Sequence, residues 1–177
     1  MQFDWKHCLA VDFKVVREDW QKFTLSDRAI LKVKPVLTGI WRAKDQVNPI
    51  TQEPLYSWNT FKHVRVVSYP QEYSGEQTTV PITPELLAQS IEETVDFESV
   101  GKDDEWSVYN LFDGTVLRLR LNITAISRTK FHGPTGEPLY SLATGQDNYR
   151  IKVAINLIQK PRALDSTPKA VRPVVYA

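Results

Sequence analysis

The chain has few of the residues that enzymes and metal proteins gather into clusters. It contains one cysteine, Cys8, and three histidines, His7, His63 and His132. A single cysteine cannot form an intramolecular disulfide or an all-cysteine metal site, and the histidines lack the spacing of a metal-binding pair. No phosphate-binding glycine loop and no nucleophile motif is present. We therefore expect no metal, no cofactor and no enzymatic activity.

The sequence also lacks a long apolar run and an excess of charge of one sign. No run approaches the roughly 20 apolar residues that span a bilayer. The first ten residues, interrupted by Asp4, Lys6 and His7, are not typical of a signal peptide. With 22 basic and 21 acidic residues the net charge is +1, so the molecule as a whole does not attract nucleic acid or a membrane surface. Together with the single cysteine, this predicts a soluble, cytoplasmic protein without a membrane partner.

What the chain does contain is a repeat. When the sequence is aligned with itself at an offset of 86 residues, residues 20–27 match residues 106–113 and residues 30–34 match residues 116–120. After a shortening by two residues, the pentapeptide Glu-Pro-Leu-Tyr-Ser occurs in both copies, at 53–57 and at 137–141. Such an ordered series predicts an internal duplication, with residues 1–94 as the first module and residues 95–177 as the second.

Each module is predicted to be a meander of about five antiparallel strands, curled into a small barrel-like sheet. Alternating apolar and polar residues predict long strands over 29–42 and 115–128. Asp113-Gly114, between two alternating runs, predicts a tight type I′ turn. The first module has Asp27-Arg28 at this place, which predicts a looser turn. The predicted fold class is therefore all-β.

One short helix is predicted near residues 84–93, as a link between the modules. Thr83 can cap its first turn and Pro84 suits its first position. The corresponding segment of the second module contains Pro173, which cannot continue a helix. The second module is therefore predicted to end in an extended C-terminal tail.

The most informative functional signal is a duplicated set of basic residues. In each long strand, the basic residues are predicted to lie on the face opposite the apolar row. A neighbouring strand contributes further basic residues. The set is Lys32, Lys34, Arg42, Lys44 and Arg65 in the first module and Arg118, Arg120, Arg128, Lys130 and Lys152 in the second, with His63 and Arg150 as an additional matched pair. Two interpretations stay open: a solvated face whose charges discourage edge pairing, and basic grooves for an anionic partner such as single-stranded nucleic acid.

Two polar residue types recur in the repeated pentapeptide. Glu53, Tyr56, Glu137 and Tyr140 are candidates for a repeated polar contact, and the alternative is that Leu and Tyr of this segment simply pack.

Without a catalytic motif, the chain is predicted to be a non-enzymatic binding or adaptor protein. Its expected partner is a protein, a second copy of itself or nucleic acid. The alternatives are a structural subunit joined through its tail and an enzyme with a site between the two halves.

Overall fold

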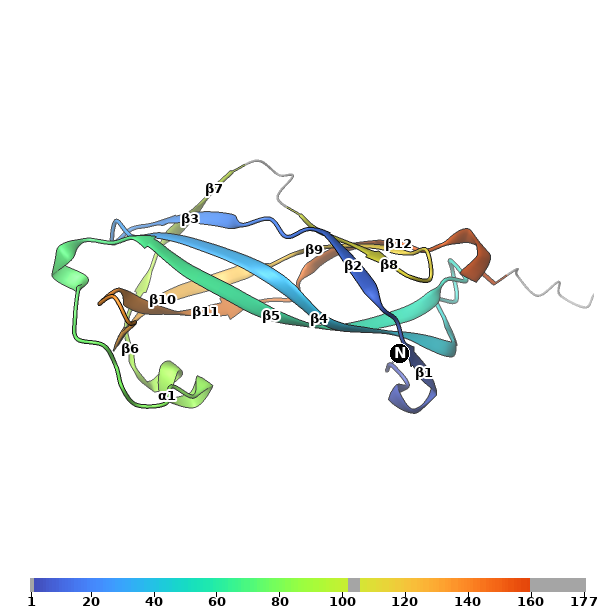
Figure 1. Cartoon of the computed structure of the whole chain (residues 1–177), viewed down its shortest axis with the longest axis horizontal. Coiled ribbons are helices and arrows are strands. Elements are labelled where there is room, and N and C mark those ends of the chain that lie inside the picture. Colours follow the sequence, from blue (N-terminus) through green and yellow to red (C-terminus); the bar gives the residue numbers. More distant parts are fainter. Residues whose placement is uncertain (1, 102–105, 160–177) are drawn as a thin grey trace, which may run out of the picture.

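The protein is an elongated all-β molecule with one short α-helix (Figure 1). Its computed structural model describes residues 2–101 and 106–159, and the tail predicted at the C-terminus lies outside them. The strands form three antiparallel sheets, so the predicted all-β class with one short helix is confirmed. No helix in the described ranges is long and apolar enough to cross a membrane.

Sheet A is built on the longest strand, β4 (Ile30–Val47), which pairs on one side with β5 (Pro54–Ser68). On its other side β4 pairs with β3 (Gln21–Leu25) near its start and with β1 (Cys8–Ala10) near its end. Strand β7 (Phe97–Val100) completes sheet A by pairing with β3.

Sheets B and C contain the other strands. Sheet B has the order β12 (Asn148–Lys152), β9 (Val116–Arg120), β8 (Ser107–Leu111) and β2 (Phe13–Arg17). Sheet C has the order β11 (Pro138–Thr144), β10 (Ile123–His132) and β6 (Ile91–Val95). The helices are the 3-10 turns η1 (Trp5–His7), η2 (Gln71–Tyr73) and η3 (Ile155–Leu157), and α1 (Pro84–Gln89).

The strand order differs from the predicted meanders. Strand β2 pairs with β8 and not with β3, which follows it in the chain. In the same way β7 pairs with β3 and not with β8. Among the strands that the structure describes, the three sheets stay open and none closes into a barrel.

One of the two predicted long strands is broken. The stretch 115–128 divides into β9 and β10 at Leu121 and Asn122. The buried side chain of Gln21 lies at this break: its amide nitrogen donates to the Leu121 carbonyl at 3.1 Å, and its amide oxygen accepts from the Leu121 N–H at 3.0 Å. A side chain thus satisfies backbone groups that a neighbouring strand would otherwise pair.

The helix begins as predicted and ends early. Thr83 Oγ1 accepts a hydrogen bond from the N–H of Leu86 at 3.2 Å, and Pro84 occupies the first turn. The predicted end near residue 93 is wrong, because the chain from Ile91 onward pairs with β10 as strand β6 and buries Val95.

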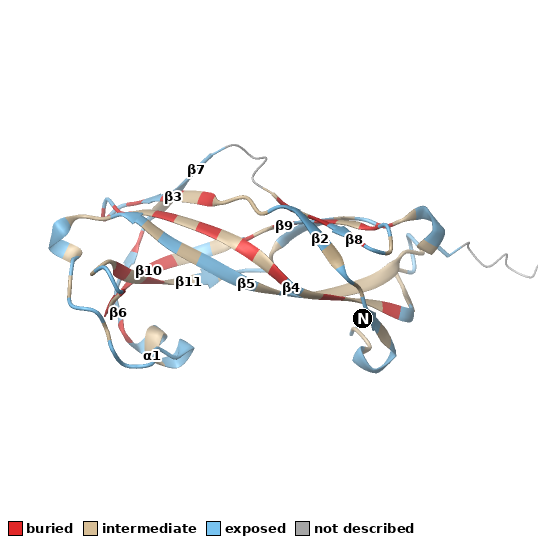
Figure 2. Cartoon of the chain, in the orientation of Figure 1, coloured by how far each residue is buried: buried red, intermediate tan, exposed pale blue. Residues whose placement is uncertain are grey.

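Two apolar cores lie between the sheets, and both use the long strand β4, along which buried residues alternate with partly exposed ones (Figure 2). The first core packs sheet A against sheet C and contains Phe23, Leu25, Leu31, Val33, Val95, Ile126 and Tyr140. The second packs sheet B against the distal part of sheet A and contains Leu37, Ile40, Tyr109, Leu111, Leu117 and Leu119. Each core therefore takes residues from both halves of the chain.

Candidate functional site

Arg128, a predicted anion-binding residue, is buried in an ion-pair cluster. Its guanidinium lies 3.2 Å from Asp27 Oδ2 and 2.8 Å from Glu93 Oε2, over the ring of Tyr73. The hydroxyl of Tyr140 donates to the same Asp27 oxygen at 2.8 Å. Burial raises the pKa of Tyr140, and the hydrogen bond to Asp27 raises it further. The charge of Arg128 is thus already matched inside the protein.

Arg42 makes the matching contact in the other half. Its guanidinium pairs with Asp113 Oδ2 at 2.9 Å, and the Tyr56 hydroxyl donates to that oxygen at 2.7 Å. Burial raises the pKa of Tyr56 to about 12. In both clusters the arginine and tyrosine come from one half of the chain and the aspartate from the other. The repeated tyrosines therefore join the two halves.

The predicted basic row does not stay on one face of β4. The pairing of β4 with β5 shifts register between Leu37 and Gly39. Beyond the shift the even-numbered residue Ile40 is buried at 2% exposure, and Arg42 follows it inward. Before the shift Lys32 remains on the outer face. Lys34 is also there, but it pairs with Glu18 at 2.9 Å.

The repeated glutamates stabilise turns. Glu53 Oε2 accepts from the Thr51 hydroxyl at 3.0 Å, and Glu137 Oε2 accepts from the Thr135 hydroxyl at 2.7 Å. Burial alone would raise the pKa of Glu137, but the hydrogen bonds from Thr135 outweigh it and the pKa is lowered. These contacts are internal, and a role toward a partner stays a prediction.

The outer face of sheet B carries basic side chains on three of its four strands, of which Arg17 pairs with Asp19 at 3.3 Å. Its four strands contain no aspartate or glutamate. Leu117 and Leu119 of β9 are fully buried, so the residues that alternate with them face outward. The cations of these strands are Lys14, Arg17, Arg118, Arg120, Arg150 and Lys152.

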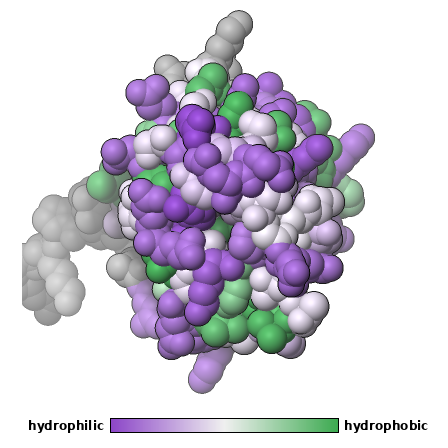
Figure 3. Space-filling model, turned by 90° about the vertical axis from the view of Figure 1, so that its left-hand side faces the viewer, coloured by the Kyte–Doolittle hydropathy of each residue, from purple (hydrophilic) through white to green (hydrophobic). Residues whose placement is uncertain are grey.

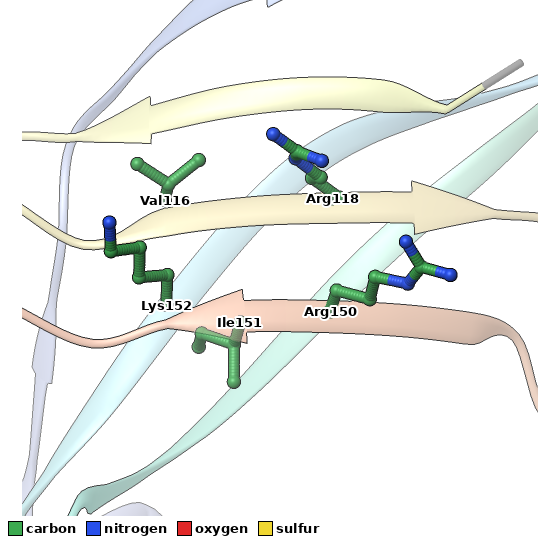
Figure 4. A pocket seen from close by; sticks show the side chains of 5 residues that line it. All are labelled: Val116, Arg118, Arg150, Ile151 and Lys152. Atoms are coloured by element: carbon green, nitrogen blue, oxygen red, sulfur yellow. The ribbon is translucent and has the colours of Figure 1, made fainter. Parts of the chain in front are cut away.

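Three of these cations form what we call the sheet B patch: Arg118, Arg150 and Lys152. Arg118 lies directly opposite Arg150, and Lys152 lies opposite Val116. With Val116 and Ile151 they line a shallow hollow of about 400 Å³ (Figure 4). The three cationic side chains stand on the same side of β9 and β12, whereas Ile151 points to the other side.

The sheet B patch has little internal neutralisation. Among residues 2–101 and 106–159, neither Arg118 nor Lys152 has an ion-pair partner. The guanidinium of Arg150 lies over the Trp106 ring, 4.7 Å from its centroid. Like charges directly opposite each other destabilise a sheet, so an anion bound between Arg118 and Arg150 would relieve their repulsion.

Sequence reasoning found four of the six cations on the strands of sheet B, Arg118, Arg120, Arg150 and Lys152, and missed Arg17. It placed no function on Trp106 or on Lys14, which is exposed on β2. The available signal was the match of Trp106 to Trp20 in the repeat. Of the other predicted cations, Lys44 and Lys130 are exposed on other sheets, and Arg120 is half-buried with contacts inside the molecule.

A second kind of surface lies between the halves, where the alternative enzyme site was expected. A hollow of about 620 Å³ between β5, α1 and β11 is lined by Val64, Val66, Ile82, Leu87 and Leu139. Hydrophobic side chains gather at the level of α1 in the end view of Figure 3, whose remaining surface is mostly hydrophilic. The acid among its lining residues is Glu137, whose pKa is lowered, so that group is not suited to act as a general acid.

No family model, no curated protein and no solved structure matches this chain. Within the described part, no three His, Cys, Asp or Glu side chains lie close enough to hold a metal ion.

Proposed function

We propose that this protein is a non-enzymatic binding module that holds single-stranded nucleic acid on the outer face of sheet B. The observation that carries the proposal is the sheet B patch, in which Arg118, Arg150 and Lys152 stand together without an ion pair among the described residues. The chain has a net charge of only +1. Because the total is so small, three cations side by side on strands that contain no acid reflect a local segregation of charge, which favours an anionic partner.

A flexible single strand suits this surface better than a compact ligand. The hollow is shallow and lies on an open sheet, whereas small-molecule sites are enclosed and mostly apolar. Proteins that bind single strands combine a basic track for the phosphates with aromatic rings on which bases stack. Trp106 stacks on Arg150, and Phe112, 76% exposed, lies in the turn between β8 and β9. Sheet B thus has an aromatic ring that contacts a cation of the patch and an exposed aromatic ring in one of its turns.

We also infer that the chain is an internal duplication of one module, with residues 1–94 and 95–177 as the copies. Matched positions make matched bonds: the N–H of Ser26 donates to the Asp96 carbonyl at 2.8 Å, and the N–H of Phe112 donates to the Asp12 carbonyl at 2.9 Å. The two Asp–Arg–Tyr clusters repeat this correspondence in their side chains.

The proposal is tested by fluorescence anisotropy with a labelled single-stranded oligonucleotide of about 16 nucleotides. The test variant is Arg118→Gln/Arg150→Gln/Lys152→Gln. The control is Lys6→Gln/Lys44→Gln/Lys130→Gln, which removes three exposed cations from other elements. We expect binding by the wild type to weaken with salt, with a log–log slope of about −2 for three phosphate contacts.

The test variant should bind about tenfold more weakly or worse and lose most of that slope, while the control stays near the wild type. Circular dichroism verifies that all three proteins are folded. Absence of salt-sensitive binding by the wild type, or equal losses in the two variants, would refute the proposal. Unlabelled duplex and unlabelled single strand are compared as competitors of the probe. Equal displacement by the two would overturn the choice of a single-stranded partner.

A further inference from the structure

Sheet A carries cations at two of the positions that correspond to the sheet B patch, and a third cation on the neighbouring strand. On β4, Lys32 lies opposite Arg65 of β5 on one side and opposite Lys22 of β3 on the other. In sheet B, Arg118 matches Lys32 in the repeat and lies opposite Arg150. The cross-strand register thus places Arg65, and not His63, at the position of Arg150. We call Lys22, Lys32 and Arg65 the sheet A patch.

Among the described residues, the sheet A patch also lacks internal neutralisation. Arg65 is exposed and the two lysines are half-buried. In the part of the chain that the structure describes, none of the three has an ion-pair partner. The acid nearest in register is Glu98, which lies opposite Thr24 and therefore one row away from Lys22. Glu18, near the start of β3, is already paired with Lys34.

One tryptophan contacts the sheet B patch, and another contacts the row of residues next to the sheet A patch. Trp20 precedes β3 as Trp106 precedes β8. The Trp20 ring lies 5.0 Å from the ring of His63 and 5.2 Å from Lys34 Nζ, while Trp106 lies 4.7 Å from the guanidinium of Arg150. Both surfaces therefore combine cations on adjacent strands with an aromatic ring, the combination that binds single strands.

We infer that the sheet A patch is a second binding site for the same class of polyanion, so that one chain holds two strands or two segments of one strand. This inference rests on the proposed function of the sheet B patch. The two sites differ in chemistry, since the sheet B patch has two arginines and one lysine, whereas the sheet A patch has one arginine and two lysines. Arginine binds phosphate through two parallel hydrogen bonds and lysine does not. The sheet A site is therefore the weaker one.

The test is a calorimetric titration of the full chain with a single-stranded oligonucleotide of about six nucleotides, short enough to occupy one site. We expect two oligonucleotides per wild-type chain. Lys22→Gln/Lys32→Gln/Arg65→Gln should leave one site with the tighter affinity. Arg118→Gln/Arg150→Gln/Lys152→Gln should leave one site with the weaker affinity, and the two triple changes combined should leave none.

The outcomes separate the two proposals. One result would overturn the second site and leave the proposed function standing. In it, each wild-type chain binds one oligonucleotide, the sheet B variant loses this binding, and the sheet A variant retains it. No binding by the wild type, or binding that survives the combined variant, would overturn both. Thermal unfolding of each variant excludes loss of fold as the cause, and the Lys6→Gln/Lys44→Gln/Lys130→Gln control should keep both sites.

Discussion

At the scale of single residues, two aspartates join the halves of the chain. Asp27 Oδ2 accepts from Tyr140 and pairs with Arg128, and Asp113 makes the equivalent contacts on the other side. The side chain of Asp27 is only 3% exposed and that of Arg128 11%. At such burial the loss of one partner is costly, because it leaves an uncompensated charge in the interior.

We expect Asp27→Ala to lower the free energy of unfolding by about 3 kcal/mol, since Arg128 keeps Glu93 but Tyr140 loses its acceptor. Asp113→Ala should cost less, about 1–2 kcal/mol, because its cluster is more exposed and Tyr56 keeps a contact with Thr115. Urea unfolding measures both. Asp27→Asn, which retains an acceptor oxygen, should fall between Asp27→Ala and the wild type. A change below about 1 kcal/mol for Asp27→Ala would show that the cluster contributes little.

At the scale of elements, the turn between β3 and β4 and the turn between β8 and β9 have the same geometry, which the sequence analysis did not predict. The predicted type I′ turn at Asp113-Gly114 is wrong: the N–H of Leu111 donates to the Thr115 carbonyl at 2.8 Å, which leaves a three-residue loop with positive φ at Gly114 alone. The first half of the chain has the same loop, closed from Leu25 to Ala29, with Arg28 at φ 70°. It is therefore not the looser turn that its sequence predicted. Such loops need a left-handed residue in third place.

Arg28 is strained at this position and glycine is not. Arg28→Gly should therefore raise the free energy of unfolding by about 0.5–1 kcal/mol, while Gly114→Ala should lower it by about 1–2 kcal/mol. The new Cβ at position 114 would also lie 3.1 Å from the Cβ of Ala154. Arg28→Ala is the matched control, because it removes the exposed ion pair with Glu72 without relieving the backbone. Chemical unfolding of the three variants measures these changes. An increase in the free energy of unfolding for Arg28→Ala equal to that for Arg28→Gly would contradict the strain argument.

The sequence predicts those elements whose signal is local. Alternation identifies β3 and β8, which have the same burial pattern, and Thr83 with Pro84 identifies the start of α1. The register shift follows Leu37, whose N–H donates to the Tyr109 hydroxyl at 3.2 Å, and the break at Leu121 is bonded by Gln21, so both features involve residues far away in the chain. This is why the inward direction of Arg42 and Arg128 could not be predicted, whereas the cations on β9 and β12 were placed correctly on one face.

At the scale of the whole molecule, the main difference from expectation is an exchange of strands between the halves. Phe13 of β2 lies opposite Leu111 of β8, and the matching Phe97 of β7 lies opposite Leu25 of β3. Alternation cannot reveal this exchange, because β3 and β8 offer the same apolar pattern to either partner. Since each core also mixes residues from both halves, we expect the chain to unfold as one cooperative unit.

Engineered disulfides test the exchange directly. Lys14 lies opposite Asn110, and Thr24 lies opposite Glu98. Residues opposite each other in antiparallel strands have Cα atoms about 4.5–5.5 Å apart, within the range that a disulfide spans. In a Cys8→Ser background, the double variants Lys14→Cys/Asn110→Cys and Thr24→Cys/Glu98→Cys should both form disulfides on mild oxidation.

The discriminating control is Lys14→Cys/Thr24→Cys, which a hairpin of β2 with β3 would place opposite each other. Thiol titration and the mobility of the oxidised chain on a non-reducing gel report each crosslink. The Lys14–Asn110 link closes a loop of nearly 100 residues, so it should raise the free energy of unfolding by about 3–4 kcal/mol. Ready oxidation of Lys14→Cys/Thr24→Cys, with both exchanged pairs remaining reduced, would instead establish the meander order and separate the halves. Both cores would then have to be built within single halves, which the positions of Leu37, Ile40, Val95 and Ile126 oppose.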